Sequence, residues 1–116
     1  MSKSLEKRCI RAWRLQLRGK TDSLTNPYWG GTGLRDFCRY YGVASAASII
    51  EREAEEIAHK EWRNETGLVG WSPAFSDWFS EHRPRFEYAA RLSLESGDAS
   101  IEIEDEISCE IEHWNA

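Results

Sequence analysis

The C-terminal part of the chain alternates apolar and acidic side chains. From Ile101 to Glu112 the odd positions are apolar except Asp105, and the even positions are acidic except Ser108. A period of two is what a β-strand needs when one face is buried and the other is wet. The sequence therefore predicts a strand whose wet face carries carboxylates about 6.8 Å apart, twice the strand rise. This predicted row comprises Glu102, Glu104, Glu106, Glu110 and Glu112.

A second strand is predicted to pair with the first. Gly97-Asp98 has the composition of a two-residue hairpin turn. Folding the chain there makes residues 86–96 and 99–111 antiparallel strands. Apolar side chains then meet apolar ones across the hairpin, and Arg91 meets Glu104, as cross-strand energetics favour. This register match favours the hairpin.

The rival interpretation of the same segment is two helices in an all-α fold. Pro84 can start the first of them and Gly97 can end it. The second helix would bury one stripe of apolar side chains. That stripe comprises Ile103, Ile107, Ile111 and Trp114.

Residues 1–84 are predicted to form four helices, delimited by cap residues and by glycine or proline stops. A chain of 116 residues is long enough for one core and too short for two. The predicted fold is therefore one compact α+β domain over residues 1–116, with a mostly helical part (1–84) and an acidic hairpin (85–113). The predicted helices are Ser4–Arg18, Thr32–Gly42, Ser45–Asn64 and one that begins at Ser72-Pro73 and ends before Pro84.

Charge is unevenly distributed along the chain, although the formal net charge is only −5. Residues 1–42 hold nine Lys or Arg against three acids, and residues 87–116 hold one against nine. The N-terminal helix carries a basic stripe on one face. Such a stripe contacts phosphates, or it neutralises the acidic C-terminal face or is simply a solvated helix surface, and contact with phosphates is the less favoured interpretation. The basic stripe comprises Lys7, Arg11, Arg14 and Arg18.

One segment has the spacing of a DNA-binding motif. In Leu34–Ile49 a small residue, Cys38, is followed four positions later by Gly42 and then by Val43, which resembles the helix-turn-helix of bacterial repressors. The segment departs from the motif at Ser48, where an apolar residue is expected. The following helix also carries several glutamates, which phosphates repel. A DNA-binding regulator is therefore the alternative function, and an ordinary pair of helices explains the same residues.

No pattern in the sequence indicates catalysis, a cofactor or a metal site. Glu56 and His59 share a helical face, but metal sites need more ligands. The glycines that precede Thr32 lack the Lys-Ser/Thr of a phosphate-binding loop. No nucleophile motif or pair of carboxylates suited to acid–base chemistry is recognisable. We therefore expect a protein that is not an enzyme.

Three cysteines, Cys9, Cys38 and Cys109, are far apart and lie among apolar positions, which predicts buried free thiols in a reducing cytoplasm. No apolar run approaches the roughly 20 residues of a membrane span. We therefore expect a cytoplasmic protein with no membrane partner.

A dense line of negative charge is costly through self-repulsion, so it requires an explanation beyond solubility. We expect the acidic face, including Asp105, to imitate a nucleic-acid backbone and to dock into a Lys/Arg-rich groove of a protein partner. Two aromatic side chains of a loop, Tyr28 and Trp29, and the four cations of the basic stripe are expected as secondary contacts. Small inhibitors of bacterial defence from phages and mobile elements, including anti-CRISPR proteins, are similar in size and charge. Direct nucleic-acid binding is less favoured, and a phage structural or assembly protein is a further alternative.

Overall fold

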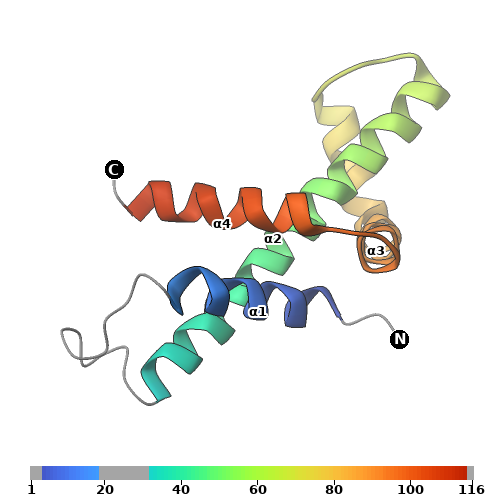
Figure 1. The fold of residues 1–116 in the computed structure, drawn as a ribbon. Helices are drawn as coiled ribbons and strands as arrows, with labels where there is room; N and C mark the ends of the chain where they lie inside the picture. The colour runs from blue at the N-terminus through green and yellow to red at the C-terminus, as the bar shows by residue number, and fades with distance from the viewer. Residues whose placement is uncertain (1–3, 19–31, 115–116) are drawn as a thin grey trace.

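The computed structural model describes residues 4–18 and 32–114, and the secondary structure of these residues is entirely helical (Figure 1). The predicted α+β fold is therefore wrong, and the all-α alternative has the correct class. The four helices are α1 (Leu5–Arg18), α2 (Thr32–Thr66), α3 (Pro73–Ser96) and α4 (Ser100–Trp114).

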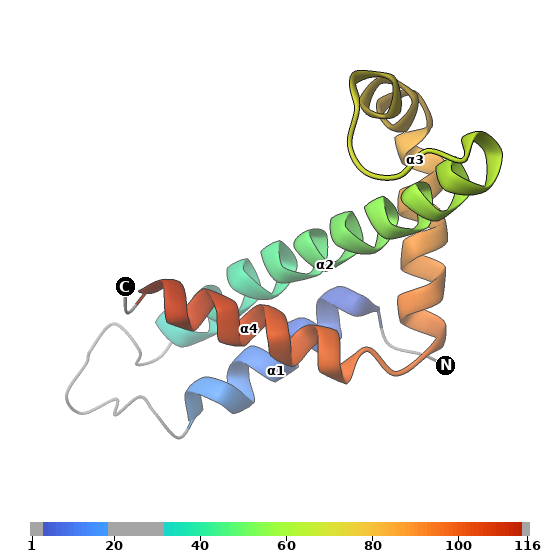
Figure 2. The same cartoon turned by 90° about the horizontal axis from the view of Figure 1, so that it is seen from above.

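Helix α2 is the spine of the molecule. Its 35 residues extend for about 52 Å at 1.5 Å per residue. Helices α1 and α4 lie against its N-terminal and middle parts, and α3 begins beside its C-terminal part (Figure 2). The radius of gyration is 17.3 Å, whereas a compact chain of this length has about 13 Å. The molecule is therefore elongated and not compact, with extents of 58 × 38 × 21 Å.

Helix α2 continues through Gly42, where the sequence predicted a turn. A Cβ atom added at Gly42 would lie 2.8 Å from both the backbone N and the Cα of Ile10 in α1. The glycine is therefore required for the close approach of two helices, not for a turn. Ser45 does not cap a new helix either, because its buried Oγ accepts a hydrogen bond from Trp13 Nε1 (3.0 Å). The helix-turn-helix interpretation of Leu34–Ile49 is wrong, since that segment is one continuous helix.

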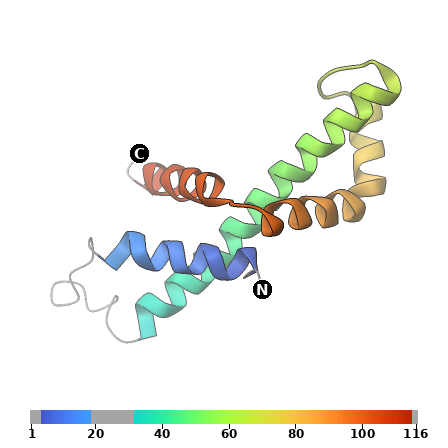
Figure 3. The same cartoon turned by 45° about the vertical axis from the view of Figure 1, so that its right-hand side comes forward.

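Helix α3 begins where the sequence predicted it but does not end before Pro84. Ser72 has extended backbone angles (φ −151°, ψ 161°), and its Oγ accepts a hydrogen bond from Phe75 N (3.1 Å). Pro84 lies inside the helix, and α3 changes direction near it (Figure 3). Proline removes one backbone hydrogen bond and crowds the preceding turn, which bends a helix. The bend lets α3 pack on the C-terminal part of α2 and then run towards the start of α1.

The predicted β-hairpin is wrong, because its two strands are the second half of α3 and all of α4. Gly97 and Asp98 do form a connection, and Asp98 Oδ1 accepts a hydrogen bond from Ser100 N (3.0 Å) at the start of α4. Ile103 and Ile107 are buried, one helical turn apart, whereas Ile101 is 71% exposed. A spacing of four satisfies a helix as well as a strand, which is why the alternation misled the prediction.

We predict that Gly42→Ala destabilises the protein, although alanine is the better helix former by about 1 kcal/mol. The added methyl group meets backbone atoms of Ile10 that no side-chain movement can clear. Overpacking of this kind costs about 1–3 kcal/mol, which exceeds the gain in helix propensity. Chemical denaturation measures the change in the free energy of unfolding. Gly97→Ala is the control, because its new Cβ meets only Ser93 O at 3.5 Å. A Gly42→Ala variant as stable as the wild type would contradict this account of the contact between α1 and α2.

Candidate functional site

Four of the predicted carboxylates form an exposed surface on α4. None of them makes an ion pair with any residue in the described part of the chain. Successive helical residues are rotated by about 100°, so these side chains point in different directions around the exposed side of α4. The predicted straight row of carboxylates is therefore wrong, although the concentration of negative charge remains. This acidic α4 surface comprises Glu102, Glu104, Asp105 and Glu112.

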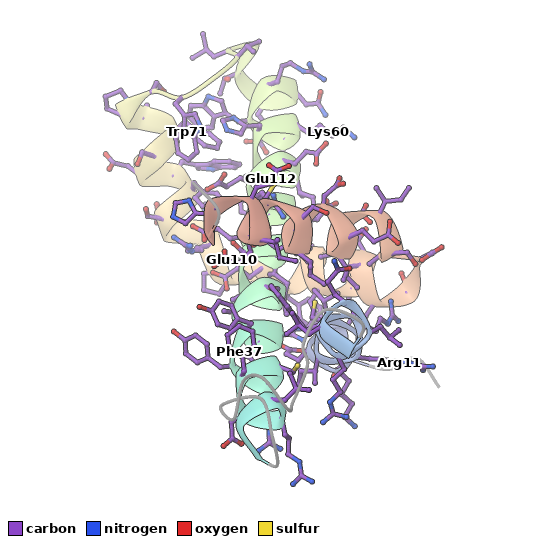
Figure 4. The ribbon with its side chains drawn as sticks, turned by 60° about the vertical axis from the view of Figure 1, so that its left-hand side comes forward. Arg11, Phe37, Lys60, Trp71, Glu110 and Glu112 are labelled. Carbon is purple, nitrogen blue, oxygen red and sulfur yellow. The ribbon has the colours of Figure 1, made fainter. Side chains whose placement is uncertain are left out.

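The other two predicted carboxylates occupy different environments. Glu106 Oε2 accepts a hydrogen bond from Arg52 Nη2 of α2 (2.5 Å), and the Glu106 side chain is only 14% exposed. Glu110 is half-buried. Glu110 and Glu112 leave α4 on different sides (Figure 4). Glu106 is therefore a structural residue that holds α4 on α2.

Helix α2 extends the acidic α4 surface. Burial raises the pKa of Glu53 in α2 above its ordinary value, and the negative charges of Glu56 and Glu102 raise it further. Because like charges raise a carboxyl pKa only at close range, the two helices concentrate negative charge at the same place. The positive charge of Lys60 opposes this effect only partly.

The basic stripe forms no ion pair with the acidic α4 surface among the residues that the structure describes, although Arg11 and Glu104 line the same cavity between α1 and α4. Lys7, Arg11 and Arg14 are exposed and form no ion pair with residues 4–18 or 32–114. Helices α1 and α4 are neighbours, but Arg11 projects away from α2 (Figure 4). These exposed side chains agree with a solvated helix surface, whereas neutralisation of the acidic face by ion pairs is not confirmed. The side chain of Arg18, and both Tyr28 and Trp29, lie outside the described residues.

Charges close to the core instead join α1 to the end of α3. Arg91 donates hydrogen bonds to the two carboxylate oxygens of Glu6 (2.8 and 2.7 Å) and one to Glu95 (3.0 Å). Glu95 in turn accepts a hydrogen bond from Leu5 N, the first residue of α1 (2.7 Å). The hydrogen bonds from Arg91 hold the pKa of Glu6 below its usual range. The predicted cross-strand pair of Arg91 and Glu104 is therefore wrong, because Arg91 pairs with Glu6 and Glu95 instead.

Arg8 completes this connection between α1 and α3. Its guanidinium donates hydrogen bonds to the carbonyl oxygens of Leu94 (3.3 Å), Glu95 (2.7 Å) and Gly97 (3.0 Å). These carbonyls lie at the C-terminal end of α3, where they have no partner within the helix. Sequence reasoning missed Arg8, because its partners are more than 80 residues away along the chain. We call Glu6, Arg8, Arg91 and Glu95 the α1–α3 latch, and its role is structural.

The thiols and imidazoles do not form a reactive site. Cys9 and Cys38 are buried as predicted, but Cys109 is exposed. Burial raises the pKa of Cys9 to about 12, with the negative charge of Glu6 adding to the shift. His59 stacks on the ring of Phe75 (centroids 4.1 Å apart). Within residues 4–18 and 32–114 no group of His, Cys, Asp or Glu is arranged to hold a metal ion.

Sequence reasoning also missed an exposed apolar surface at the connection between α2 and α3. Leu68, Val69 and Trp71 are all exposed there, and no other part of the described chain places three large apolar side chains within four positions at the surface. The signal was present in the sequence as three apolar residues beside Gly67 and Gly70.

Comparison of the chain with protein-family models, with curated proteins and with solved structures found no match. None of the described helices combines the length and the apolar character that crossing a bilayer requires. The function is therefore argued from the surfaces of the molecule.

We predict that two single substitutions have opposite effects on stability at neutral pH. Glu6 has a lowered pKa, so it contributes stability above its unfolded value of about 4.3 and loses it as the pH falls through the folded pKa. Glu53 has a raised pKa, so its ionised form costs free energy once the pH exceeds that value. At pH 7, Glu6→Gln should lower the free energy of unfolding by about 1 kcal/mol or less, and Glu53→Gln should raise it by a similar amount.

Thermal unfolding of the two variants and the wild type across pH 3 to pH 7 measures these effects. Both differences from the wild type should shrink towards the acidic end, because protonation of each glutamate removes the charge on which its effect depends. Differences of the same sign for both variants would contradict the assigned environments.

Proposed function

We propose that this protein is a non-enzymatic binding protein, an inhibitor or adaptor, whose acidic α4 surface docks into a Lys/Arg-rich groove of a nucleic-acid-handling complex. The observation that carries the proposal is the set of four exposed carboxylates on α4 that form no ion pair with any described residue. The pKa of Glu53, which is raised first by burial and then by the charges of Glu56 and Glu102, supports it, because a basic partner would relieve the repulsion between these carboxylates.

The charge and the shape of α4 support a resemblance to a nucleic-acid strand. The 15 residues of α4 extend for about 22 Å and carry the four carboxylates of the acidic α4 surface, or one per about 5.6 Å. One strand of DNA carries one phosphate per about 3.4 Å of helix axis. Because the carboxylates surround the exposed part of a rod, they suit a groove that contacts a helix from more than one side. The similarity lies in sign and rod shape.

The carboxylates of the acidic α4 surface are not used to join helices, which favours a role in binding over a role in stability. The α1–α3 latch and the Arg52–Glu106 pair show where this fold uses ion pairs to hold helices together. The acidic α4 surface takes no part in them. Uncompensated charge of one sign attracts an oppositely charged partner over a distance and accelerates association. Small inhibitors of bacterial defence from phages and mobile elements are similar in size and charge, and we propose a role of that type.

We predict that reversing charge at Glu104, Asp105 and Glu112 to Lys leaves the fold intact and abolishes partner binding. These side chains are exposed, and surface substitutions usually change stability by less than about 0.5 kcal/mol. Glu102 is kept, because a cation in the first helical turn opposes the helix dipole. Glu106 is kept because Lys would face Arg52. Each close charge pair in a complementary interface contributes about 1.5 kcal/mol or more, so losing three should reduce affinity at least a hundredfold.

A pull-down from a bacterial lysate, followed by mass spectrometry, compares the wild type with this variant. A control variant reverses Glu65, Asp77 and Glu81, which are exposed on α2 and α3 and produce the same change in net charge. The partner should be captured by the wild type and the control, lost with the α4 variant and displaced by heparin. Capture of the same proteins at the same level by the α4 variant would overturn the proposal.

A direct test of DNA binding separates this proposal from contact with nucleic acid through the basic stripe. The purified protein should show no binding to duplex DNA at moderate salt. Binding that is lost on replacing Arg11 and Arg14 by Ala would instead assign the function to α1.

A further inference from the structure

The connection between α2 and α3 exposes three large apolar side chains. Val69 is 80% exposed, Trp71 59% and Leu68 57%. This apolar tip, defined as Leu68, Val69 and Trp71, lies at the end of the molecule where α2 passes into α3, away from α4 (Figure 1). A contiguous apolar patch on a protein surface commonly marks an interaction site.

The backbone of the apolar tip is held in a defined conformation. Gly67 and Gly70 have φ angles of 76° and 86°, in the left-handed region that side chains disfavour. Thr66 Oγ1 accepts a hydrogen bond from Leu68 N (3.1 Å) at the end of α2. Ser72 caps α3 on the other side of the connection. The apolar side chains are therefore presented at the surface by a constrained turn, and little conformational entropy remains to be lost when a ligand binds.

Trp71 is anchored on one side and open on the other. Its ring meets His59 edge-on (centroids 5.1 Å apart) and Phe75 edge-on (4.9 Å apart). Phe75 is fully buried, so the aromatic cluster between α2 and α3 supports the indole. A tryptophan held in this way, with more than half of its surface free, is typical of an energetic anchor in an interface.

A cavity of about 410 Å³ lies beside the apolar tip. Lys60 and Trp71 both lie at this end of the molecule in Figure 4. Neither Lys60 nor Arg63 forms an ion pair with any residue that the structure describes, and the side chains that line the cavity include these two cations and one carboxylate, Glu56. The side chains that line the cavity include Glu56, His59, Lys60, Arg63, Val69 and Trp71.

We propose that this cavity binds an acidic, apolar peptide segment of a partner protein. An aliphatic or aromatic side chain of the segment packs against Val69 and Trp71, and a neighbouring carboxylate accepts charge-assisted hydrogen bonds from Lys60 and Arg63. The inference goes beyond the proposed function, because it concerns another surface and a ligand of the opposite charge.

The charges around the apolar tip favour a peptide over an anionic membrane. Glu65 and Asp77 are exposed in the last turn of α2 and near the start of α3. A planar anionic membrane that covers the apolar tip would be attracted by the two cations but repelled by these carboxylates. A peptide can place one or two carboxylates on Lys60 and Arg63 alone.

A random dodecapeptide library displayed on phage, selected on the immobilised full-length protein, tests the proposal. The enriched sequences should place Asp or Glu within two positions of Leu, Ile, Phe or Trp. A synthetic peptide from the selection should bind at least tenfold more weakly to Val69→Asp and to the double variant Lys60→Gln/Arg63→Gln. Val69 is the most exposed of the three tip residues, so its substitution leaves the core unchanged, and circular dichroism verifies the fold.

Leu92→Asp is the matched control, because Leu92 is 53% exposed on the second half of α3, away from the apolar tip. Its affinity for the selected peptide should equal that of the wild type. No enrichment, enrichment of basic peptides, or undiminished binding to Val69→Asp would overturn the proposal. Self-association that Val69→Asp abolishes would assign the cavity to a second copy, and tip-dependent binding to phosphatidylserine vesicles would assign it to a membrane. Either result also overturns the proposal.

Discussion

The close approach of α1 to α2 at Gly42 is the constraint on which the rest of the arrangement depends. The absence of a side chain there lets the backbone of Ile10 pack directly on α2. One turn further along α2, the buried hydrogen bond from Trp13 to Ser45 fixes how α1 lies on α2. Helix α4 then packs against both helices. The interface between α1 and α2 therefore has one specific register. Few other registers would place a small residue under the backbone of Ile10 and also satisfy the buried Trp13–Ser45 hydrogen bond.

Helix α3 connects the two halves of this elongated molecule. Its first half forms an aromatic cluster with α2, in which Trp62 meets both Phe75 and Trp78. After the bend near Pro84, its second half reaches the start of α1, where the α1–α3 latch joins the two. The fold therefore uses ionic and capping contacts where helix ends meet and apolar packing elsewhere. The four carboxylates of the acidic α4 surface take part in neither, and for that reason the proposed function rests on them.

Much of the helical structure could be predicted from local sequence, and the failures have a common cause. The ends of α1, the start of α2 at Thr32 and the start of α3 at Ser72-Pro73 were predicted correctly, because caps and stops act within one turn. Gly42 and Pro84 were predicted as ends of helices and lie inside them. Local sequence does not contain the reason why either residue is tolerated inside a helix. Gly42 allows α1 to pack closely on α2, and Pro84 lies where α3 bends.

The sequence by itself determined the separation of charge between the two ends of the chain and the amount of acid on the last element. Only the tertiary structure decided that this element is a helix, because isoleucines at 103, 107 and 111 fit a strand and a helix equally well. It also decided which charges are neutralised: Glu106 meets Arg52 and Glu6 meets Arg91, across 54 and 85 residues of chain. Electrostatic energy depends on distance in space and on burial, and neither can be obtained from the order of residues.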